Sequence, residues 1–215
     1  MATGVQERTA DAGQLDYASL FAGLEQSPTE ATGAAFVEQL LSLWKAAYLV
    51  MTPHAVDTFV VRHGSFQYMF DDYATLEATG KVPYNPVFEA RLVAAVGWSK
   101  PQSGCRDDYR LKGWVGPTEA WWGRKWDKGH FIAHSIGGAV DQCELNVFIQ
   151  RRSLNRGWSK AGKRYRIMET YCVEHPGAFC FSRPIYVDGS ARPTALEFGV
   201  LKADGSLWVE VFANS

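Results

Sequence analysis

The sequence lacks several features that would each indicate a class of protein. Its four cysteines (Cys105, Cys143, Cys172 and Cys180) form no CxxC pair, which argues against a zinc ribbon or a thioredoxin-type motif. No hydrophobic run approaches the length of a membrane helix, and residues 1–13 have no apolar core of a secretory signal. We therefore expect no membrane partner, and a protein that is either cytoplasmic or exported by a leaderless route.

An excess of positive charge is also missing. The chain has 22 Lys and Arg residues against 23 Asp and Glu residues, a formal net charge of -1. This total does not indicate a nucleic-acid-binding protein, so any basic surface has to be local. With 215 residues and an ordinary apolar content, the chain can bury a core without disulfide or metal staples.

The cysteines allow two interpretations. Cys172 and Cys180 flank a His-Pro-Gly break and could approach each other, whereas buried free thiols are the simpler reading. Disulfides would imply an oxidising compartment.

The N-terminal part of the chain shows mainly helical patterns. Proline at the start of 27–30 and an apolar stripe from Phe36 to Tyr48 predict a helix that ends before Thr52-Pro53. A short strand is expected at 58–61 and a second helix over Phe66 to Ala78. The type of the segment from Val87 to Val96 is left open.

The C-terminal part contains more strand signals. From Gly97 to Trp126 the chain is rich in Gly, Trp and charge, which is typical of a long loop. Helical spacing follows over 164–175 up to Pro176-Gly177, and a strand is expected over 179–187. Asp204-Gly205 predicts the turn of a hairpin over 196–212.

These elements together predict an α+β fold with a mixed or antiparallel sheet. We expect a flexible tail over 1–13, a mostly helical extension over 14–96 packed on the core, and a core over 97–215.

His130 is the first candidate for chemistry. It closes the run Asp127-Lys128-Gly129-His130, in which Gly129 allows a tight turn, and the apolar Phe131-Ile132-Ala133 follows. A neutral imidazole with a pKa of about 6.5 can accept a proton from water. His134 lies four residues later, but the segment between them lacks the glutamate of a zinc protease. A zinc site with His130, His134 and a cysteine is kept as an alternative.

The segment 151–166 contains seven basic residues and no acidic one. A block of one sign in a chain of negative net charge favours an anionic partner, and arginine forks match phosphate oxygens. Asn155 lies inside this block. It is either the N-cap of a helix or an oxygen ligand of Mg²⁺, and spacing alone does not decide between the two.

Three tryptophans precede the block, at 121, 122 and 126. They are either packing residues or a platform on which bases stack, and packing is the simpler interpretation.

Three segments together resemble one enzyme family. They are Asp127-Lys128-Gly129-His130, the run 145–150, and Leu154-Asn155-Arg156-Gly157-Trp158 with Glu169 downstream. This order is similar to the DNA/RNA non-specific endonucleases, the ββα-metal family with the signature Asp-Arg-Gly-His. The resemblance covers about residues 126–169, extends to the strand-like 182–186, and also looks close to the versions found in bacterial toxins and effectors.

The resemblance implies a ββα-metal core and a role for each matching residue. His130 corresponds to the general base and Asn155 to the direct ligand of Mg²⁺ (or Mn²⁺). Lys128 stands where the family has arginine, so it keeps the charge and loses the bidentate fork. Glu169 follows Asn155 by fourteen residues instead of about two helical turns, and it corresponds to the glutamate that holds metal-bound water. The upstream phosphate-gripping arginine corresponds to Arg106, Arg110 or Arg124.

The function that we predict from the sequence is a Mg²⁺-dependent, sequence-nonspecific endonuclease acting on DNA, RNA or both, with a toxin or effector role. An immunity or inhibitor protein is a further expected partner. The predicted substrate-binding residues are Arg124, Asp127, Arg151, Arg152 and Arg156. The alternatives are a catalytically inactive nucleic-acid-binding module and the zinc hydrolase using His130 and His134.

Overall fold

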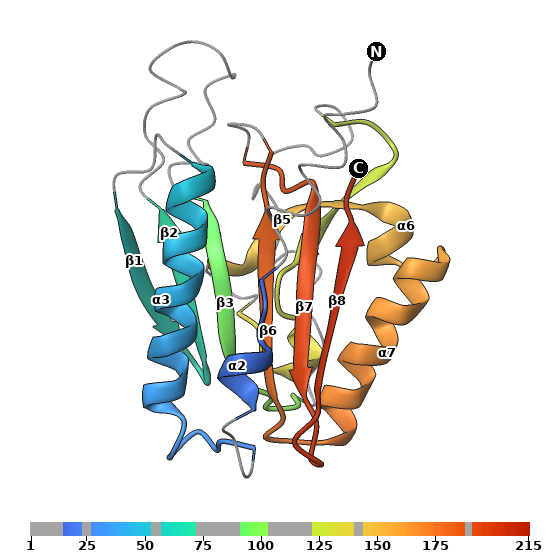
Figure 1. Cartoon of the computed structure of the whole chain (residues 1–215). Coiled ribbons are helices and arrows are strands. Elements are labelled where there is room, and N and C mark those ends of the chain that lie inside the picture. Colours follow the sequence, from blue (N-terminus) through green and yellow to red (C-terminus); the bar gives the residue numbers. More distant parts are fainter. Residues whose placement is uncertain are drawn as a thin grey trace.

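A computed structural model describes residues 15–22, 27–52, 57–71, 91–102, 122–139, 144–187 and 191–215. Its elements confirm the α+β class (Figure 1). In chain order they are α2 (Ala18–Phe21), α3 (Ala34–Met51), β1 (Thr58–His63), β2 (Phe66–Asp71), β3 (Leu92–Trp98), β4 (Trp126–His130), η1 (His134–Ile136), η2 (Glu144–Asn146), β5 (Val147–Arg151), α6 (Arg152–Asn155), α7 (Lys160–Glu174), β6 (Phe179–Ile185), β7 (Ala195–Leu201) and β8 (Leu207–Ala213).

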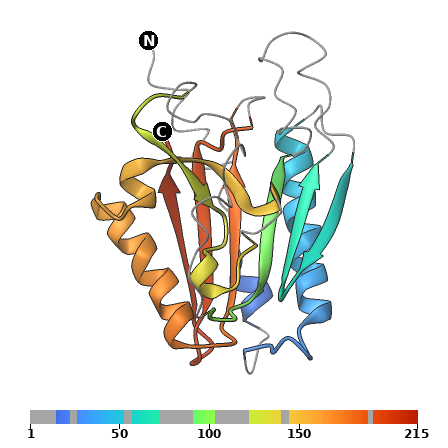
Figure 2. The ribbon, with the colours of Figure 1, turned by 180° about the vertical axis from the view of Figure 1, so that it is seen from behind.

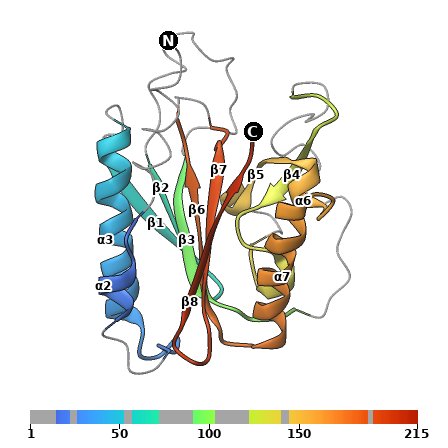
Figure 3. The same cartoon turned by 45° about the vertical axis from the view of Figure 1, so that its right-hand side comes forward.

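Six strands form one antiparallel sheet in the order β1-β2-β3-β6-β7-β8, and β4 and β5 form a separate two-stranded ribbon. Helices α2 and α3 cover one face of the sheet, and the ribbon with α6 and α7 covers the other face (Figure 3). Side chains alternate between these layers. In β6, Phe179 and Phe181 pack toward α3, whereas Cys180 packs in the cluster that contains Met168 and Cys172 of α7.

Helix α3 confirms the predicted helix, although it begins at Ala34, after Gly33, and not near Pro28. By length and composition this helix could cross a membrane or serve as a signal sequence, so the expectation that no run reaches that length was wrong. Five of its side chains are nevertheless buried against the sheet as part of the folded domain: Phe36, Val37, Leu40, Trp44 and Tyr48.

The helix predicted over Phe66 to Ala78 is wrong, because its first six residues form β2. Strand β2 pairs with β1 and β3 and is buried on both faces, so its apolar residues do not alternate with polar ones. Residues 72–78 lie outside the described part of the chain. The segment of undecided type also contains a strand, β3.

The description of 14–96 as mostly helical is corrected too, because the described residues of this segment contribute β1, β2 and most of β3 to the sheet. The predicted boundary between residues 96 and 97 falls inside β3, which pairs with β6 through Trp98. Three C-terminal predictions are confirmed: the helix before Pro176, the strand at 179, and the hairpin around Gly205, whose φ is +79°.

The chain leaves the sheet after β3, builds β4, β5, α6 and α7, and returns as β6 beside β3 (Figure 2). Ser99 ties the two ends of this excursion together. Its backbone N–H donates to the carbonyl of Ala178 (2.9 Å) and its carbonyl accepts from Gly177 N–H (2.8 Å). Its buried hydroxyl donates to the carbonyl of His175 (3.1 Å). The ribbon and its helices are therefore anchored to the middle of the sheet.

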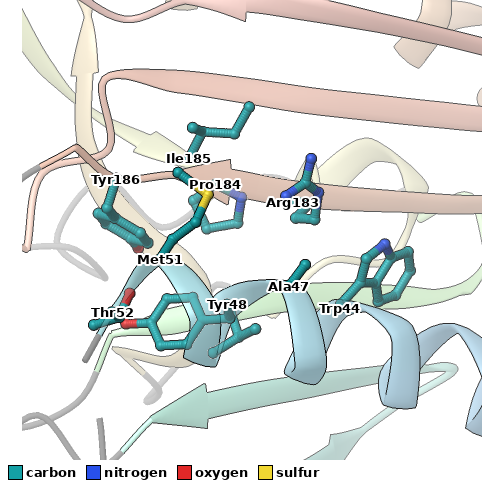
Figure 4. A pocket seen from close by; sticks show the side chains of 10 residues that line it. Trp44, Ala47, Tyr48, Met51, Thr52, Arg183, Pro184, Ile185 and Tyr186 are labelled. Atoms are coloured by element: carbon teal, nitrogen blue, oxygen red, sulfur yellow. The ribbon is translucent and has the colours of Figure 1, made fainter. Parts of the chain in front are cut away.

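Two buried arginines lie on the α3 side of the sheet. Arg183 donates to Glu197 (2.6 Å), which also accepts from Tyr17. Arg91 lies 3.6 Å from Asp71, which accepts from Tyr48. Figure 4 shows the small pocket between α3 and β6, with Tyr48 near Tyr186 and Trp44 beyond Arg183. Because these charges are paired with each other, they lie within the packing between α3 and the sheet and offer no charge to a ligand.

The fully buried Asn214 joins the ribbon to the sheet. Its side-chain oxygen accepts from the N–H of Arg151 (2.7 Å), and its amide donates to the carbonyls of Ile149 (3.0 Å) and Pro193 (2.8 Å). We predict that Asn214→Ala lowers the free energy of unfolding by about 2–4 kcal/mol, because three backbone groups lose their partner. Urea titration measures this loss. The exposed neighbour Ser215 is the control: if Ser215→Ala has an equal effect, the account is wrong.

Candidate active site

The ribbon carries the sequence motif along a regular strand. In β4, His130 pairs with Val147 of β5 and Lys128 pairs with Ile149. Gly129 therefore lies in a strand. The tight turn that the sequence had indicated at this position is wrong. A Cβ atom at Gly129 would lie 2.1 Å from Oε1 and 2.5 Å from Cβ of Gln150. The glycine is required because the buried Gln150 side chain crosses the backbone there.

His130 is the last residue of β4, and the apolar segment after it is a loop. Asn146 is fully buried and holds this loop. Its Oδ1 accepts from the N–H of Ile132 (2.8 Å), and its Nδ2 donates to the carbonyls of Ile132 (2.6 Å) and Ala139 (2.9 Å). The His130 side chain is half-buried, and its Nε2 atom is buried. Asn146 is a positioning residue that the sequence analysis did not single out.

The carboxylate of Asp127 binds three side chains of the segment from 152 to 156. It accepts from Nε of Arg152 (2.8 Å), from Nδ2 of Asn155 (3.2 Å), and from Arg156 through Nε (2.7 Å) and a second guanidinium nitrogen (3.0 Å). These contacts join β4 to α6 across 25 or more residues of chain. The structure thus brings together four residues that the sequence analysis predicted for the site.

Electrostatics favour the ionised form of Asp127. Burial raises the pKa of this carboxyl, but the hydrogen bonds from Arg156, Asn155 and Arg152 outweigh burial, and the net pKa is below its ordinary value. Burial has the opposite effect on the pKa of Lys128, which it lowers, because burial disfavours the charged form of both groups. Asp127 is therefore an anion that holds cations in place.

Asn155 is the last residue of α6 and not the N-cap of the next helix. That N-cap is Ser159, whose hydroxyl accepts from the N–H of Gly162 (2.9 Å). Because Nδ2 of Asn155 donates to Asp127, the amide is oriented and Oδ1 is the atom turned away from this anion. Of the two interpretations of Asn155, the structure excludes the helix cap.

Glu169 is half-buried on α7. Arg166 lies one turn earlier on the same helix and donates to the backbone carbonyl of Asn155 (2.8 Å). Residues three apart are neighbours on a helix surface, so Glu169 lies next to Arg166 along α7.

The described residues do not support the zinc alternative. They contain no group of three or more His, Cys, Asp or Glu side chains that could hold a metal ion. His134 begins the 3-10 helix η1, and Cys172 and Cys180 are buried free thiols in the core. The other two cysteines lie outside the described residues.

Beside Asp127 lies a hollow of about 300 Å³. Its lining residues are Arg124, Lys125, Arg151, Arg152, Ser153 and Trp158. Of the three tryptophans considered for base stacking, Trp126 is buried, with the guanidinium groups of Arg151 and Arg192 5.1 and 4.6 Å from its ring centroid. Arg192 also lies 5.3 Å from the ring centroid of Trp122. Trp121, Arg106 and Arg110 lie outside the described residues.

Comparisons with known proteins give remote likenesses. No family model and no curated protein matches the chain. Among solved structures, one of Sda1 nuclease with a bound zinc ion matches with a TM-score of 0.41 and 14% identity, over 78% of this chain and 93% of that one. A structure of an extracellular endonuclease matches with a TM-score of 0.35 and 11% identity, over 76% and 81%.

We predict that Asp127→Asn lowers the free energy of unfolding at pH 7 by about 1–2 kcal/mol, because the charge-assisted bonds to α6 weaken. Since the folded-state pKa of Asp127 is depressed, its contribution is present above the ordinary pKa of about 4 and is lost as the pH falls through the folded value. Urea titrations at several pH values should therefore show the two proteins converging at low pH. Asp57→Asn, which breaks an exposed ion pair with Lys45, is the control and should change the stability much less than Asp127→Asn does.

Proposed function

We propose that this chain is a divalent-metal-dependent endonuclease that hydrolyses phosphodiester bonds of DNA, RNA or both without strong sequence preference. The observation that carries the proposal is the joining of the His130 strand to the Asn155 helix by the Asp127 carboxylate. The hollow beside this junction is lined mainly by cationic side chains. A histidine, an oriented amide oxygen and a basic surface are groups that metal-assisted phosphodiester hydrolysis can use as proton acceptor, metal ligand and phosphate contact.

The residues fit a hard divalent cation such as Mg²⁺ or Mn²⁺. Oδ1 of Asn155 is an oxygen donor whose amide is already oriented by Asp127. Mg²⁺ keeps most of its waters and takes few protein ligands, so a single amide oxygen suits this ion better than it suits a metal that needs a cluster of nitrogen and sulfur ligands. We assign Asn155 as the direct ligand and Glu169 as the residue that holds its water. When bound, the cation would stabilise negative charge on the phosphate.

In the proposed reaction, His130 accepts the proton of a water molecule whose oxygen attacks phosphorus. The new P–O bond forms as the bond to the departing sugar oxygen breaks. Packing of the loop at 131–139 by Asn146 holds the end of β4, and thus His130, in place. Lys128 lies two residues earlier in the same strand, so its side chain projects on the same side as His130, where a cation can attract the phosphate.

Asp127 receives a different role from the one expected. An anion that binds Arg152 and Arg156 would repel a phosphate, so we assign it as a positioning residue for α6 and not as a contact to substrate. Arg124, Arg151 and Arg152 remain proposed substrate contacts. Because these contacts release counterions, binding should weaken steeply as salt increases.

The biological setting is a further part of the proposal. A toxin or effector nuclease, with an immunity or inhibitor protein as partner, is consistent with this chemistry. Growth inhibition on expression, relieved by a change at His130, would support this setting.

We predict that His130→Ala lowers cleavage by about 10²–10⁴-fold, because the water loses its proton acceptor. Plasmid nicking and RNA degradation with Mg²⁺ and with EDTA measure this loss. His63→Ala, which changes an exposed histidine on β1, is the matched control and should retain activity. A fully active His130→Ala protein would refute the mechanism. Binding without cleavage by the wild-type protein under every metal would instead favour the inactive binding module.

We predict that Asn155→Ala raises the Mg²⁺ concentration for half-maximal cleavage by at least about tenfold, because the ion loses its protein ligand. Asn155→Asp keeps an oxygen ligand but loses the N–H donated to Asp127 and places two carboxylates together, so it should recover only part of the lower requirement. Metal titration of activity measures the shift, and circular dichroism shows whether α6 and α7 remain folded. If higher Mg²⁺ restores nothing in a folded Asn155→Ala protein, Asn155 is not the ligand.

A further inference from the structure

The hollow beside Asp127 has a strongly one-sided charge. Four of its six lining residues are cationic, and the other two are Ser153 and Trp158. Among the described residues, no carboxylate forms an ion pair with Arg124, Lys125 or Arg151. Arg152 differs, because its guanidinium binds Asp127. The hollow therefore has a surplus of positive charge. Its volume of about 300 Å³ is at the lower end of small-ligand sites, a size that suits a phosphate with part of a nucleotide.

Trp158 is an exposed aromatic at the edge of this hollow. Trp158 is 64% exposed, whereas a tryptophan usually contributes to the stability of a protein by burying its ring. Its backbone is held in place, because its N–H donates to the carbonyl of Ser153 (2.9 Å) and Gly157 before it has a left-handed φ of +69°. The guanidinium of Arg156 lies over the ring, 5.1 Å from its centroid. The ring is thus a supported platform that faces solvent.

The hollow lies at the opposite end of β4 from His130. Arg151 pairs with Trp126 at the start of the strand, whereas His130 ends it. At about 3.3 Å per residue, these ends are about 13 Å apart. A group bound in the hollow is therefore not the phosphate attacked at His130, but it can be a neighbouring phosphate of the same strand.

We propose that this hollow binds a second phosphodiester of an unpaired nucleic-acid strand, and that the base beside it stacks on Trp158. The inference rests on the proposed function, whose substrate it narrows to strands with unpaired bases. Stacking on an aromatic side chain needs a base that has left its own duplex stack, and it tolerates any sequence because every base has a flat face. The cations contact the backbone and do not read the sequence.

The test is a binding measurement on the His130→Ala protein, in which substrate stays intact. Fluorescence anisotropy is recorded in Mg²⁺ with labelled single-stranded DNA, single-stranded RNA and duplex DNA of equal length. Trp158→Ala should weaken binding of both single strands by about tenfold and change duplex binding by less than about twofold. Trp158→Phe keeps an aromatic face and should restore most of the affinity.

The charge of the hollow is tested in the same assay. Arg124→Ala with Lys125→Ala should weaken all three ligands and reduce the slope of log Kd against log salt by about one for each lost phosphate contact. Arg62→Ala, which removes an exposed cation from β1 at the far end of the sheet, is the matched control and should leave both affinity and slope unchanged.

Two results would overturn the inference: single-strand affinity that is unchanged by Trp158→Ala, or a loss that is as large for duplex as for single strands. Neither depends on catalysis. If the wild-type protein cleaves nothing while Trp158→Ala shows the single-strand loss, the nuclease proposal fails and the binding site stands. If the wild-type protein cleaves while Trp158→Ala binds normally, the nuclease proposal stands and this inference fails.

Discussion

The candidate site depends on one carboxylate. Asp127 binds Arg152, Asn155 and Arg156 from a strand that lies 25 or more residues earlier in the chain. Helix α6 has only four residues, too short to hold its own direction in water, so its orientation comes from this anion. The same contact turns the Asn155 amide and partly neutralises the arginines nearest to it. Geometry and charge at the site are therefore set by a single group.

The rest of the molecule fixes where that group lies. Ser99 closes the base of the excursion between β3 and β6, Asn214 ties the ribbon to β8, and Asn146 holds the loop after His130. All three are buried polar residues whose partners are mainly backbone groups. Backbone partners do not change rotamer, so such bonds hold a functional loop more firmly than contacts between two side chains. Rigid attachment of this kind suits a reaction in which the attacking water has to be placed accurately.

Much of the fold could be predicted where the signal was local. Helix α7 and the hairpin around Gly205 follow from spacing and turn residues. Strand β2 was predicted as a helix because burial on both faces removed its alternation. At the site, the residue types of the motif were sufficient to single out Asp127, His130 and Asn155. The bonds of Asp127 to α6 could not be read from the sequence, since they join distant segments, and Ser159 rather than Asn155 caps the following helix. Trp158 was not distinguished because nothing in the sequence shows that its ring is exposed.

The excursion between β3 and β6 has a consequence for synthesis. Strand β3 leaves the ribosome well before its partner β6, because residues 99–178 have to be made in between. At about 5–20 residues per second, this interval is on the order of ten seconds. During it β3, an apolar strand from Leu92 to Trp98, is an edge with unpaired backbone groups. Helix α3 is made earlier and packs against β3, so it can cover one face of the strand while the second strand is still awaited. The nascent chain is thus most open to aggregation before its site exists, and a holding chaperone would act during this interval.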